Sequence, residues 1–223
     1  MGEILTYLGR YSHLLLNGTL ETLYMVSVSL IIAVVFGIPL GVLTTITRKG
    51  HILPNGVLNK TLDGIINIGR SIPFIILMVA IIPLTRAIVG TSIGTTAAIV
   101  PLAVAAIPFV ARVVDNALLE IDPGIIEAAR SMGAAPLQII VKVLLPEALP
   151  GLILGVTLTA INLIGYSAMA GAIGGGGLGD IAVRYGYQRF RVEVMVQTVV
   201  ILVLLVQLIQ WAGNKIAKFF DHR

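Results

Sequence analysis

The stretch that decides the fold runs from Glu120 to Pro150, with the sequence EIDPGIIEAARSMGAAPLQIIVKVLLPEALP. It is a polar interruption between two apolar runs that are each long enough to cross a bilayer. Asp122 is of the type that caps helix N-termini by accepting hydrogen bonds from free backbone N–H groups, and Pro123 suits the first helical position. The pattern predicts a short helix that begins at Pro123 and stops where Gly133 takes a left-handed conformation.

This short helix has an apolar and a polar side at helical spacing. The apolar side comprises Ile125, Ile126, Ala129 and Met132, and the polar side comprises Glu127, Arg130 and Ser131. A helix of about ten residues is about 15 Å long, half of the ~30 Å hydrocarbon layer, so it lies outside the lipid core. A second helical piece is expected to begin at Pro136 and to end at Leu145 and Pro146. By its physics alone, the stretch is either an ordinary capped connection or a surface for a partner.

The composition of the chain identifies an integral membrane protein. Of its 223 residues, 57% are hydrophobic and 12% are charged, and the mean hydropathy is +0.99. A soluble domain of this composition would lack a polar exterior. The net charge of +4 comes from basic residues scattered between apolar runs, which indicates a membrane topology and not a nucleic-acid surface. Cysteine is absent, which excludes disulfides and thiolate chemistry.

The apolar runs predict an all-α membrane fold with five spans, in a single domain over residues 1–223. The spans are expected at about 20–45, 62–84, 95–114, 148–171 and 194–212, with the polar loop at 120–146 between the third and the fourth. Gly37, Pro39 and Gly41 favour close helix contact or a bend in the first span, and Pro101 and Pro108 are expected to interrupt the third. The residues before the first span show no removable signal peptide.

The distribution of basic residues predicts the orientation, because Lys and Arg favour cytoplasmic loops. In one arrangement of five spans, the basic residues on the inner side of the membrane are Arg48, Lys49, Lys60, Arg112, Arg130, Lys142, Lys215, Lys218 and Arg223. The same arrangement places outside Arg10, Arg86, Arg184, Arg189 and Arg191. The inner side therefore holds nine basic residues and the outer side five, which predicts an outer N-terminus, a cytoplasmic C-terminus and a cytoplasmic 120–146 loop.

Polar residues at membrane depth mark candidate pathway positions. Asn162 in the fourth span must face protein or water, because an unpaired amide in lipid costs several kcal/mol. Tyr166, Ser167 and Met169 lie nearby on the same span, where Tyr166 and Met169 suit either a gate or simple core packing. Arg70 either extends to the interface or faces the bundle interior and pairs with a carboxylate.

Several chemistries are absent from the sequence. The three histidines, at 13, 51 and 222, are not paired at metal spacing within a span, and Ser167 has no His, Lys or Asp at its depth to act as a base. The glycine run at 174–177 lacks the Lys-Ser or Lys-Thr of a phosphate loop and is expected to form a tight turn or hinge at the outer surface. We therefore expect no catalytic residue, no metal site and no cofactor in this chain. The spans contain almost no Asp or Glu, which argues against a secondary transporter.

The spacing within the polar loop carries a family resemblance. Glu127-Ala128-Ala129 is followed after three residues by Gly133, nine residues later by Val143, and one residue later by Leu145-Pro146. This pattern resembles the EAA loop of ABC-importer permeases, from which it departs only in having Val143 where the family usually has Ile. The segments RSIPF at 70–74, AARSMGA at 128–134, KVLLPEALPG at 142–151 and GYSAMAGAIGGGGLGD at 165–180 extend the match. Together they resemble methionine-importer permeases of the type I ABC family over nearly the whole chain.

The resemblance implies partners and roles. It implies a homodimer in the bacterial cytoplasmic (inner) membrane, with two ATP-binding subunits that hold ATP and Mg, an extracytoplasmic methionine-binding protein or lipoprotein, surrounding lipid and no nucleic acid. The residues expected to couple to the ATPase are Glu127, Ala128, Ala129, Arg130, Gly133, Leu145 and Pro146. Asn162, Tyr166, Ser167 and Met169 are expected at the translocation pathway, and Asp180, Arg184, Arg189 and Arg191 where the binding protein docks.

The expected cargo is L-methionine, with D-methionine as a further substrate. The alternatives are another amino acid or small polar solute, or a channel or secondary carrier without an ATPase.

Overall fold

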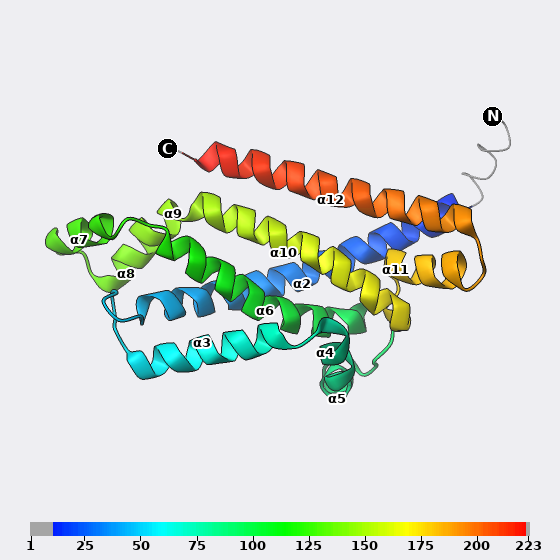
Figure 1. Ribbon diagram of the computed structural model, residues 1–223, viewed down its shortest axis with the longest axis horizontal. Coiled ribbons are helices and arrows are strands. Elements are labelled where there is room, and N and C mark those ends of the chain that lie inside the picture. The colour runs from blue at the N-terminus through cyan, green and yellow to red at the C-terminus, as the bar shows by residue number, and fades with distance from the viewer. Residues whose placement is uncertain (1–10, 222–223) are drawn as a thin grey trace. The chain divides into compact units, whose positions relative to one another are not determined.

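The computed structural model describes residues 11–221, which fall into two compact units. Arg10, His222 and Arg223, named above, lie outside the described residues. The first unit combines the chain up to Ile31 with Pro73–Ala105 and Ala160–Ile209, and the second combines Ile32–Ile72, Ala106–Thr159 and the chain from Gln210 onward. Every regular element in residues 11–221 is a helix, which confirms the all-α prediction (Figure 1).

Among residues 11–221, four helices are long and apolar enough to cross a membrane. They are α2 (Ser12–Ile46), α6 (Thr95–Leu119), α10 (Leu149–Ala170) and α12 (Val192–Phe220). The span of α10 continues into η2 (Gly171–Gly175), where the chain kinks because Ile173 and Gly174 are not helical. A fifth span exists only if the bent pair α3 (Gly56–Ser71) and α4 (Phe74–Ala80) counts as one. The helices thus cover the expected apolar runs, and α2 and α12 extend beyond the predicted ends.

The predicted second span, about 62–84, is not one continuous helix. The chain leaves the helical conformation at Ile72, which has φ −83° and ψ 122°, and α4 starts after Pro73. Proline disfavours the helical conformation of the residue before it, so Pro73 explains the break. A further short helix, α5 (Ile82–Val89), follows α4 and ends at Gly90, which is left-handed at φ 84°.

The expected interruption of the third span is wrong. α6 runs unbroken for 25 residues through Pro101 and Pro108. Each proline removes one backbone hydrogen bond, and the remaining bonds of the ladder carry the helix through.

Glycines bring helices of the second unit into close contact. A side chain at Gly41 of α2 would meet the Ala111 carbonyl of α6 at 2.5 Å, and one at Gly155 of α10 would collide with Val113. This confirms the prediction that small residues in the first run permit close packing, and Gly155 does the same in the fourth. Only backbones without a Cβ can approach so closely.

The segment after the short helix α7 (Pro123–Ser131) differs from its prediction. It consists of α8 (Pro136–Ile139), a π-helical turn η1 (Ile140–Leu144) and α9 (Leu145–Glu147), and α10 begins two residues later. The expectation that this piece ends at Leu145 and Pro146 is therefore wrong. Pro146 lies in the first turn of α9, where its missing N–H costs nothing, so it starts a helical turn instead of ending one.

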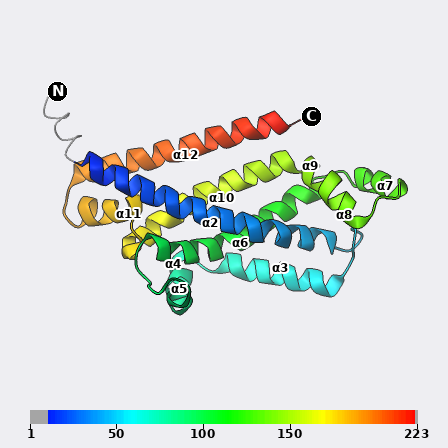
Figure 2. The ribbon, with the colours of Figure 1, turned by 180° about the vertical axis from the view of Figure 1, so that it is seen from behind.

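In the first unit, the chain after η2 folds back on α2. α11 (Gly177–Ile181) and the π-helical η3 (Ala182–Tyr187) lead into α12, and Figures 1 and 2 both show α11 beside the N-terminal part of α2. Leu15 of α2, Leu178 and Ile181 of α11, and Val194 of α12 form a buried apolar cluster. The cluster fixes α11 against these two helices.

Candidate functional site

The short helix α7 forms as its caps predict. The carboxylate of Asp122 accepts a hydrogen bond from the Gly124 N–H at 2.7 Å. Gly133 has φ +79°, and its N–H donates to the Arg130 carbonyl at 2.9 Å. An L side chain is strained at such a φ, so glycine lets the chain reverse after one short helix.

The predicted apolar side of α7 is only partly packed against its own chain. Ala129 is buried and Ile126 is half-buried, but Ile125 is exposed and Met132 is 81% exposed. Glu127 and Ala128 are also exposed, and the adjoining Leu137 of α8 is 70% exposed. Of the two remaining loop positions, Leu145 is half-buried and Pro146 is exposed. α7 and α8 together leave an apolar surface of the kind that binds a partner, here called the α7 surface and defined by Ile125, Met132 and Leu137.

A hydrogen bond connects α7 to the loop between α2 and α3. The Arg130 guanidinium donates to the His51 carbonyl at 2.8 Å. Burial, followed by the nearby positive charges of Arg130 and Arg48, lowers the pKa of the His51 imidazole below its ordinary value of 6.5. The His51 ring therefore favours its neutral form, and the loop is held against α7 by the hydrogen bond from Arg130.

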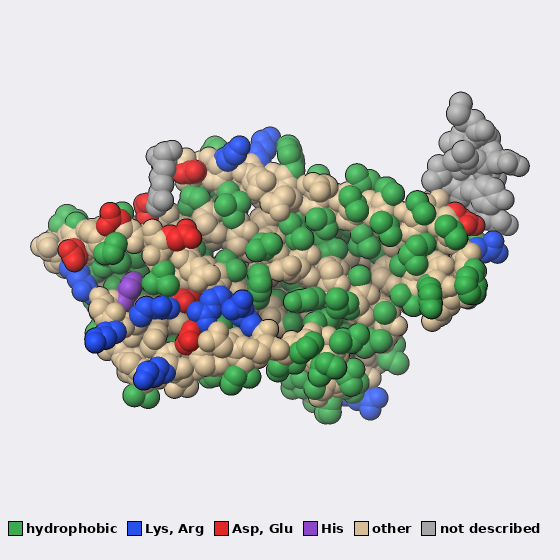
Figure 3. Space-filling model, in the orientation of Figure 1, with side chains coloured by type: hydrophobic (Ala, Val, Ile, Leu, Met, Phe, Trp, Pro, Cys, Tyr) green, Lys and Arg blue, Asp and Glu red, His purple; other side chains and the backbone are tan. Residues whose placement is uncertain are grey.

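A buried carboxylate behind this loop was not singled out from the sequence. Asp115 of α6 is 1% exposed and accepts hydrogen bonds from Arg48 at 3.0 Å, Arg112 at 3.1 Å and the Thr45 hydroxyl at 2.9 Å. Arg112 also donates to Asp63 at 2.6 Å and to Asn67 at 2.8 Å, both on α3. This ion-pair network joins the end of α2, α3 and α6 within the second unit. Figure 3 shows Lys and Arg side chains gathered over α3 and the end of α2, with Asp and Glu among them.

The i, i+3 spacing of Arg112 and Asp115 on an apolar helix was the available signal for this network. The partners on α2 and α3 are 45 or more positions away in the chain, so the sequence alone does not join them. Arg70 takes no part in the network and is exposed at the end of α3. The alternative in which Arg70 faces an interior carboxylate is not observed in the single chain.

The glycine run forms the predicted turn. Gly174, Gly176 and Gly177 have φ of 95°, 78° and 75°, which L side chains rarely adopt. Glu21 accepts a hydrogen bond from the Gly177 N–H at 2.7 Å, and the Thr22 hydroxyl accepts one from the Leu178 N–H at 2.9 Å. α2 thus supplies the acceptors for the free N–H groups that begin α11, a role for Glu21 that sequence reasoning missed.

The four predicted pathway residues lie on α10 in the first unit with different surroundings. Tyr166 is stacked on Phe74 of α4, with ring centroids 4.7 Å apart and planes at 5°. Ser167 is buried and donates to the Ile164 carbonyl, Asn162 is half-buried, and Met169 is 48% exposed. The stacking shows that Tyr166 packs against its own chain, whereas Met169 is available to a partner or to a pathway.

The predicted docking residues are gathered near Tyr185. Arg184 forms an ion pair with Asp180 one turn earlier, and the guanidinium of Arg189 lies over the Tyr185 ring at 4.6 Å from its centroid. The Arg184 guanidinium also lies 5.9 Å from that centroid. The side chain of Arg191 approaches Glu193 at 4.0 Å, and its backbone N–H donates to the Tyr185 carbonyl at 3.1 Å. The structure therefore brings all four residues near Tyr185, and Arg191 makes its contact through the backbone.

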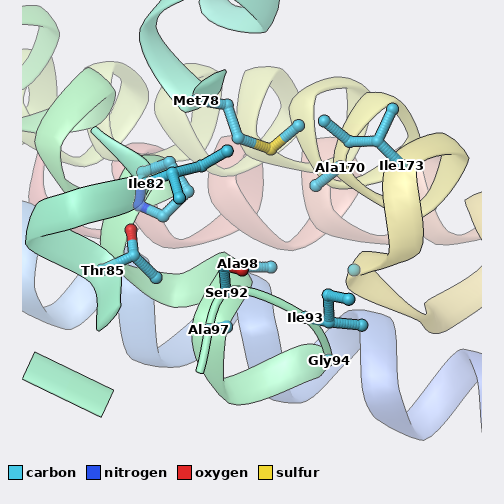
Figure 4. Close-up of a pocket in the computed structure, with 12 residues that line it drawn as sticks. Met78, Ile82, Thr85, Ser92, Ile93, Gly94, Ala97, Ala98, Ala170 and Ile173 are labelled. Atoms are coloured by element: carbon cyan, nitrogen blue, oxygen red, sulfur yellow. The ribbon is translucent and has the colours of Figure 1, made fainter. Parts of the chain in front are cut away.

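An apolar cavity of about 250 Å³ lies elsewhere in the first unit. Figure 4 shows the residues that line it, with Met78 from α4, Ile82 from α5, and Ala170 and Ile173 from the end of α10 and η2. None of the predicted pathway residues lines it, and its lining contains no charged side chain. A charged amino acid would find no counter-ion there. In residues 11–221, no group of His, Asp and Glu side chains suits a metal ion.

Long apolar helices, combined with a capped amphipathic helix too short to span a membrane, define a polytopic membrane subunit. The chain belongs to the family described as binding-protein-dependent transport system inner membrane component, whose family model matches residues 37–223.

Two relatives and one solved structure with high identity are named for methionine transport. The chain is 57% identical over 212 residues to the "Probable D-methionine transport system permease protein MetI" of Vibrio cholerae serotype O1, covering 95% of this chain and 94% of that one. It is 61% identical over 158 residues to the D-methionine transport system permease protein MetI of Escherichia coli K12, covering 71% and 73%. A solved chain from inward-facing conformations of the MetNI methionine ABC transporter is 56% identical, with a TM-score of 0.94 over 95% of this chain and 98% of that one.

Proposed function

We propose that this chain is the permease subunit of an ATP-driven importer that carries methionine across the bacterial cytoplasmic membrane. The observation that carries the proposal is the likeness to the MetNI chain, which extends over almost the full length of both chains at 56% identity. The exposed α7 surface supports it, because α7 offers a partner-binding element outside the apolar helices. ATP hydrolysis belongs to a separate subunit, which holds the ATP and Mg.

In this proposal the bent pair α3 and α4 is the fifth span, and two copies of the chain form a homodimer. The N-terminus is outside and α7 is cytoplasmic, as the distribution of basic residues favours. Two ATP-binding subunits and an extracytoplasmic methionine-binding protein or lipoprotein complete the assembly, which has lipid around it. The fourth span, α10, faces its counterpart in the second copy.

The mechanism assigns a role to each cluster of residues. The loaded binding protein docks against the segment that holds Asp180, Arg184, Arg189 and Arg191. ATP-driven closure of the ATPase subunits draws the two copies of α7 together, with Glu127, Ala128 and Arg130 at the contact, while the buried Ala129 holds α7 against its own chain. The two copies of α10 then part on the outer side, where Met169 and Asn162 border the path, and hydrolysis restores the inward-open state.

Local geometry explains why the α7 residues suit this contact. Ala128 presents only a methyl group to the exterior, so a partner surface can approach the helix closely. Glu127 is exposed in the middle of α7, so its carboxylate is accessible to a partner. Gly133 turns the chain immediately after the helix, which keeps α7 short enough to enter a cleft.

Uptake of labelled L- and D-methionine tests the proposal. The chain is expressed with its ATPase and binding protein in cells that lack their own methionine importer, and both enantiomers are tested because the relatives are named for D-methionine. We expect uptake with the natural chain and its loss with Glu127→Arg, because the reversed charge lies at the ATPase contact. Glu120→Arg is the matched control, since Glu120 is also exposed but lies before α7.

The outcomes separate the two parts of the proposal. No methionine uptake by an assembled, ATP-hydrolysing complex would contradict the substrate and leave the importer. Equal uptake by Glu127→Arg and the natural chain, at equal membrane abundance, would contradict the role of α7. Uptake without any ATPase subunit would favour a channel or secondary carrier.

A further inference from the structure

A second cavity, of about 260 Å³, lies in the second unit beside α7. Its polar lining consists of Arg48, Lys49, His51, Arg130 and Glu127, and here these five residues define the basic cavity. Glu127 and Arg130 come from α7, and the other three come from the loop after α2. The basic cavity therefore lies between two segments that are joined by the hydrogen bond from Arg130 to the His51 carbonyl.

The charges of the basic cavity do not cancel. Three fixed positive charges, on Arg48, Lys49 and Arg130, face the single carboxylate of Glu127. Arg48 is already held by Asp115, but none of the ion pairs among residues 11–221 includes Lys49 or Arg130. The pKa of His51 is lowered first by its burial and then by Arg130 and Arg48, whereas Asp115 raises it.

Two donor-bearing groups of the basic cavity also have unmet hydrogen-bonding capacity. Arg48 Nε and His51 Nδ1 are buried and have no hydrogen-bond partner. A buried polar atom without a partner costs free energy, so an oxygen-rich ligand that reached it would be stabilised. Arg48, Arg130 and Lys49 then offer several charged donors to one ligand.

We propose that the basic cavity binds a phosphate group, supplied either by the headgroup of an anionic phospholipid or by free inorganic phosphate. A phosphate carries several strong acceptor oxygens and matches the guanidinium and ammonium donors present. The volume accommodates a headgroup but not a helix, which favours this ligand over an acidic protein segment. The inference rests on the proposed function for the placement of α7 at a membrane surface and for its contact with the ATPase subunits.

The bound phosphate fastens α7 to the loop after α2. Lys49 and His51 lie on that loop, and Arg130 lies on α7, so one anion contacts both segments. The phosphate thereby adds to the hydrogen bond from Arg130 to the His51 carbonyl. The position of α7, and with it the transmission of ATPase movement, then depends on whether the basic cavity is occupied.

Binding is measured on the assembled complex by native mass spectrometry, with dioleoylphosphatidylglycerol, dioleoylphosphatidylcholine and inorganic phosphate as separate probes. The test variant is Lys49→Gln, because Lys49 lies outside the α7 contact and is exposed. Its matched control is Lys60→Gln, which removes the same charge from an exposed position on α3 that does not line the cavity. Loss of one charge-assisted contact is expected to weaken binding about tenfold.

Tighter binding of phosphatidylglycerol than of phosphatidylcholine, weakened by Lys49→Gln but not by Lys60→Gln, supports a lipid headgroup. The same pattern with inorganic phosphate alone supports the free ion. Equal binding by the natural chain and both variants, or equal weakening by both variants, overturns the proposal. It is also overturned if Lys49→Gln changes no binding but releases the ATPase subunits, because an acidic protein group then fills the cavity. Methionine is absent from this experiment, so its outcome is independent of the substrate.

Discussion

Asp115 is the residue on which the ion pairs of the second unit converge. Because it is buried while two arginines and a hydroxyl bind it, Asp115→Asn leaves Arg48 and Arg112 without their shared counter-ion. Breaking a buried pair on one side costs about 3–5 kcal/mol, and the 40% exposure of Arg48 places the expected cost at or below the lower end. We expect a lower melting temperature of the assembled complex in a thermal-shift measurement.

Asp63→Asn is the matched control for this prediction. Asp63 binds the same Arg112, but its side chain is 39% exposed, so its loss is expected to cost about 1 kcal/mol or less. Equal shifts for Asp63→Asn and Asp115→Asn would contradict the special role of the buried carboxylate.

His51 provides a pH dependence at the residue scale. Its folded pKa is lowered, so the unfolded chain takes up a proton more readily than the folded chain as the pH falls below about 6.5. The stabilisation is complete above that pH and is lost progressively toward the lowered folded pKa. We expect the melting temperature to fall between pH 8 and pH 5.5, and His51→Gln to reduce that fall.

At the scale of elements, the C-terminal end of α7 depends on Gly133. A side chain there meets no neighbouring atom within 4 Å, so the cost of Gly133→Ala comes from its left-handed φ alone, at about 1–2 kcal/mol. We expect the complex that contains this variant to hydrolyse ATP but to import less methionine, because the chain no longer turns in the same direction after α7. The measurement is the ratio of uptake to ATP hydrolysis.

Gly64→Ala is the corresponding control within α3. It also meets no neighbouring atom and has no left-handed φ, so alanine should be neutral or slightly stabilising there. An unchanged ratio for Gly133→Ala would show that the turn tolerates a side chain.

The elements also show which parts of the fold can be predicted from the sequence. α7 was predicted closely, because Asp122, Pro123 and Gly133 act locally and each has one structural preference. The long apolar runs were predicted for the same reason. The three prolines at 73, 101 and 146 behave differently: the first separates two helices, the second is absorbed by a continuous helix, and the third begins a helical turn. Their outcomes depend on neighbouring helices, which a single sequence does not place.

The same limit applies to the sites. Glu21 and Gly177 are 156 positions apart, and Arg48 and Asp115 are 67 apart, yet each pair is hydrogen-bonded. A carboxylate in an apolar run indicates that some partner exists, but its identity depends on the tertiary fold. The predicted α7 residues were grouped correctly because all of them lie within one short segment, and their coupling role stays a prediction.

At the scale of the whole molecule, the exposed α7 surface predicts that association with the ATPase depends on apolar contacts. Met132 is 81% exposed and Leu137 is 70% exposed in the chain alone, outside the four helices long enough to span a membrane. Burial of one such side chain against a partner contributes about 1.5–3 kcal/mol, so a charge at this position should weaken association strongly. We expect Met132→Asp to lower the amount of ATPase that copurifies with the membrane complex, and Met132→Leu to preserve it. Because Met132 contributes little to the packing of its own chain, both variants should insert equally. If Met132→Asp retained the full amount of ATPase, the α7 surface would not be the docking surface.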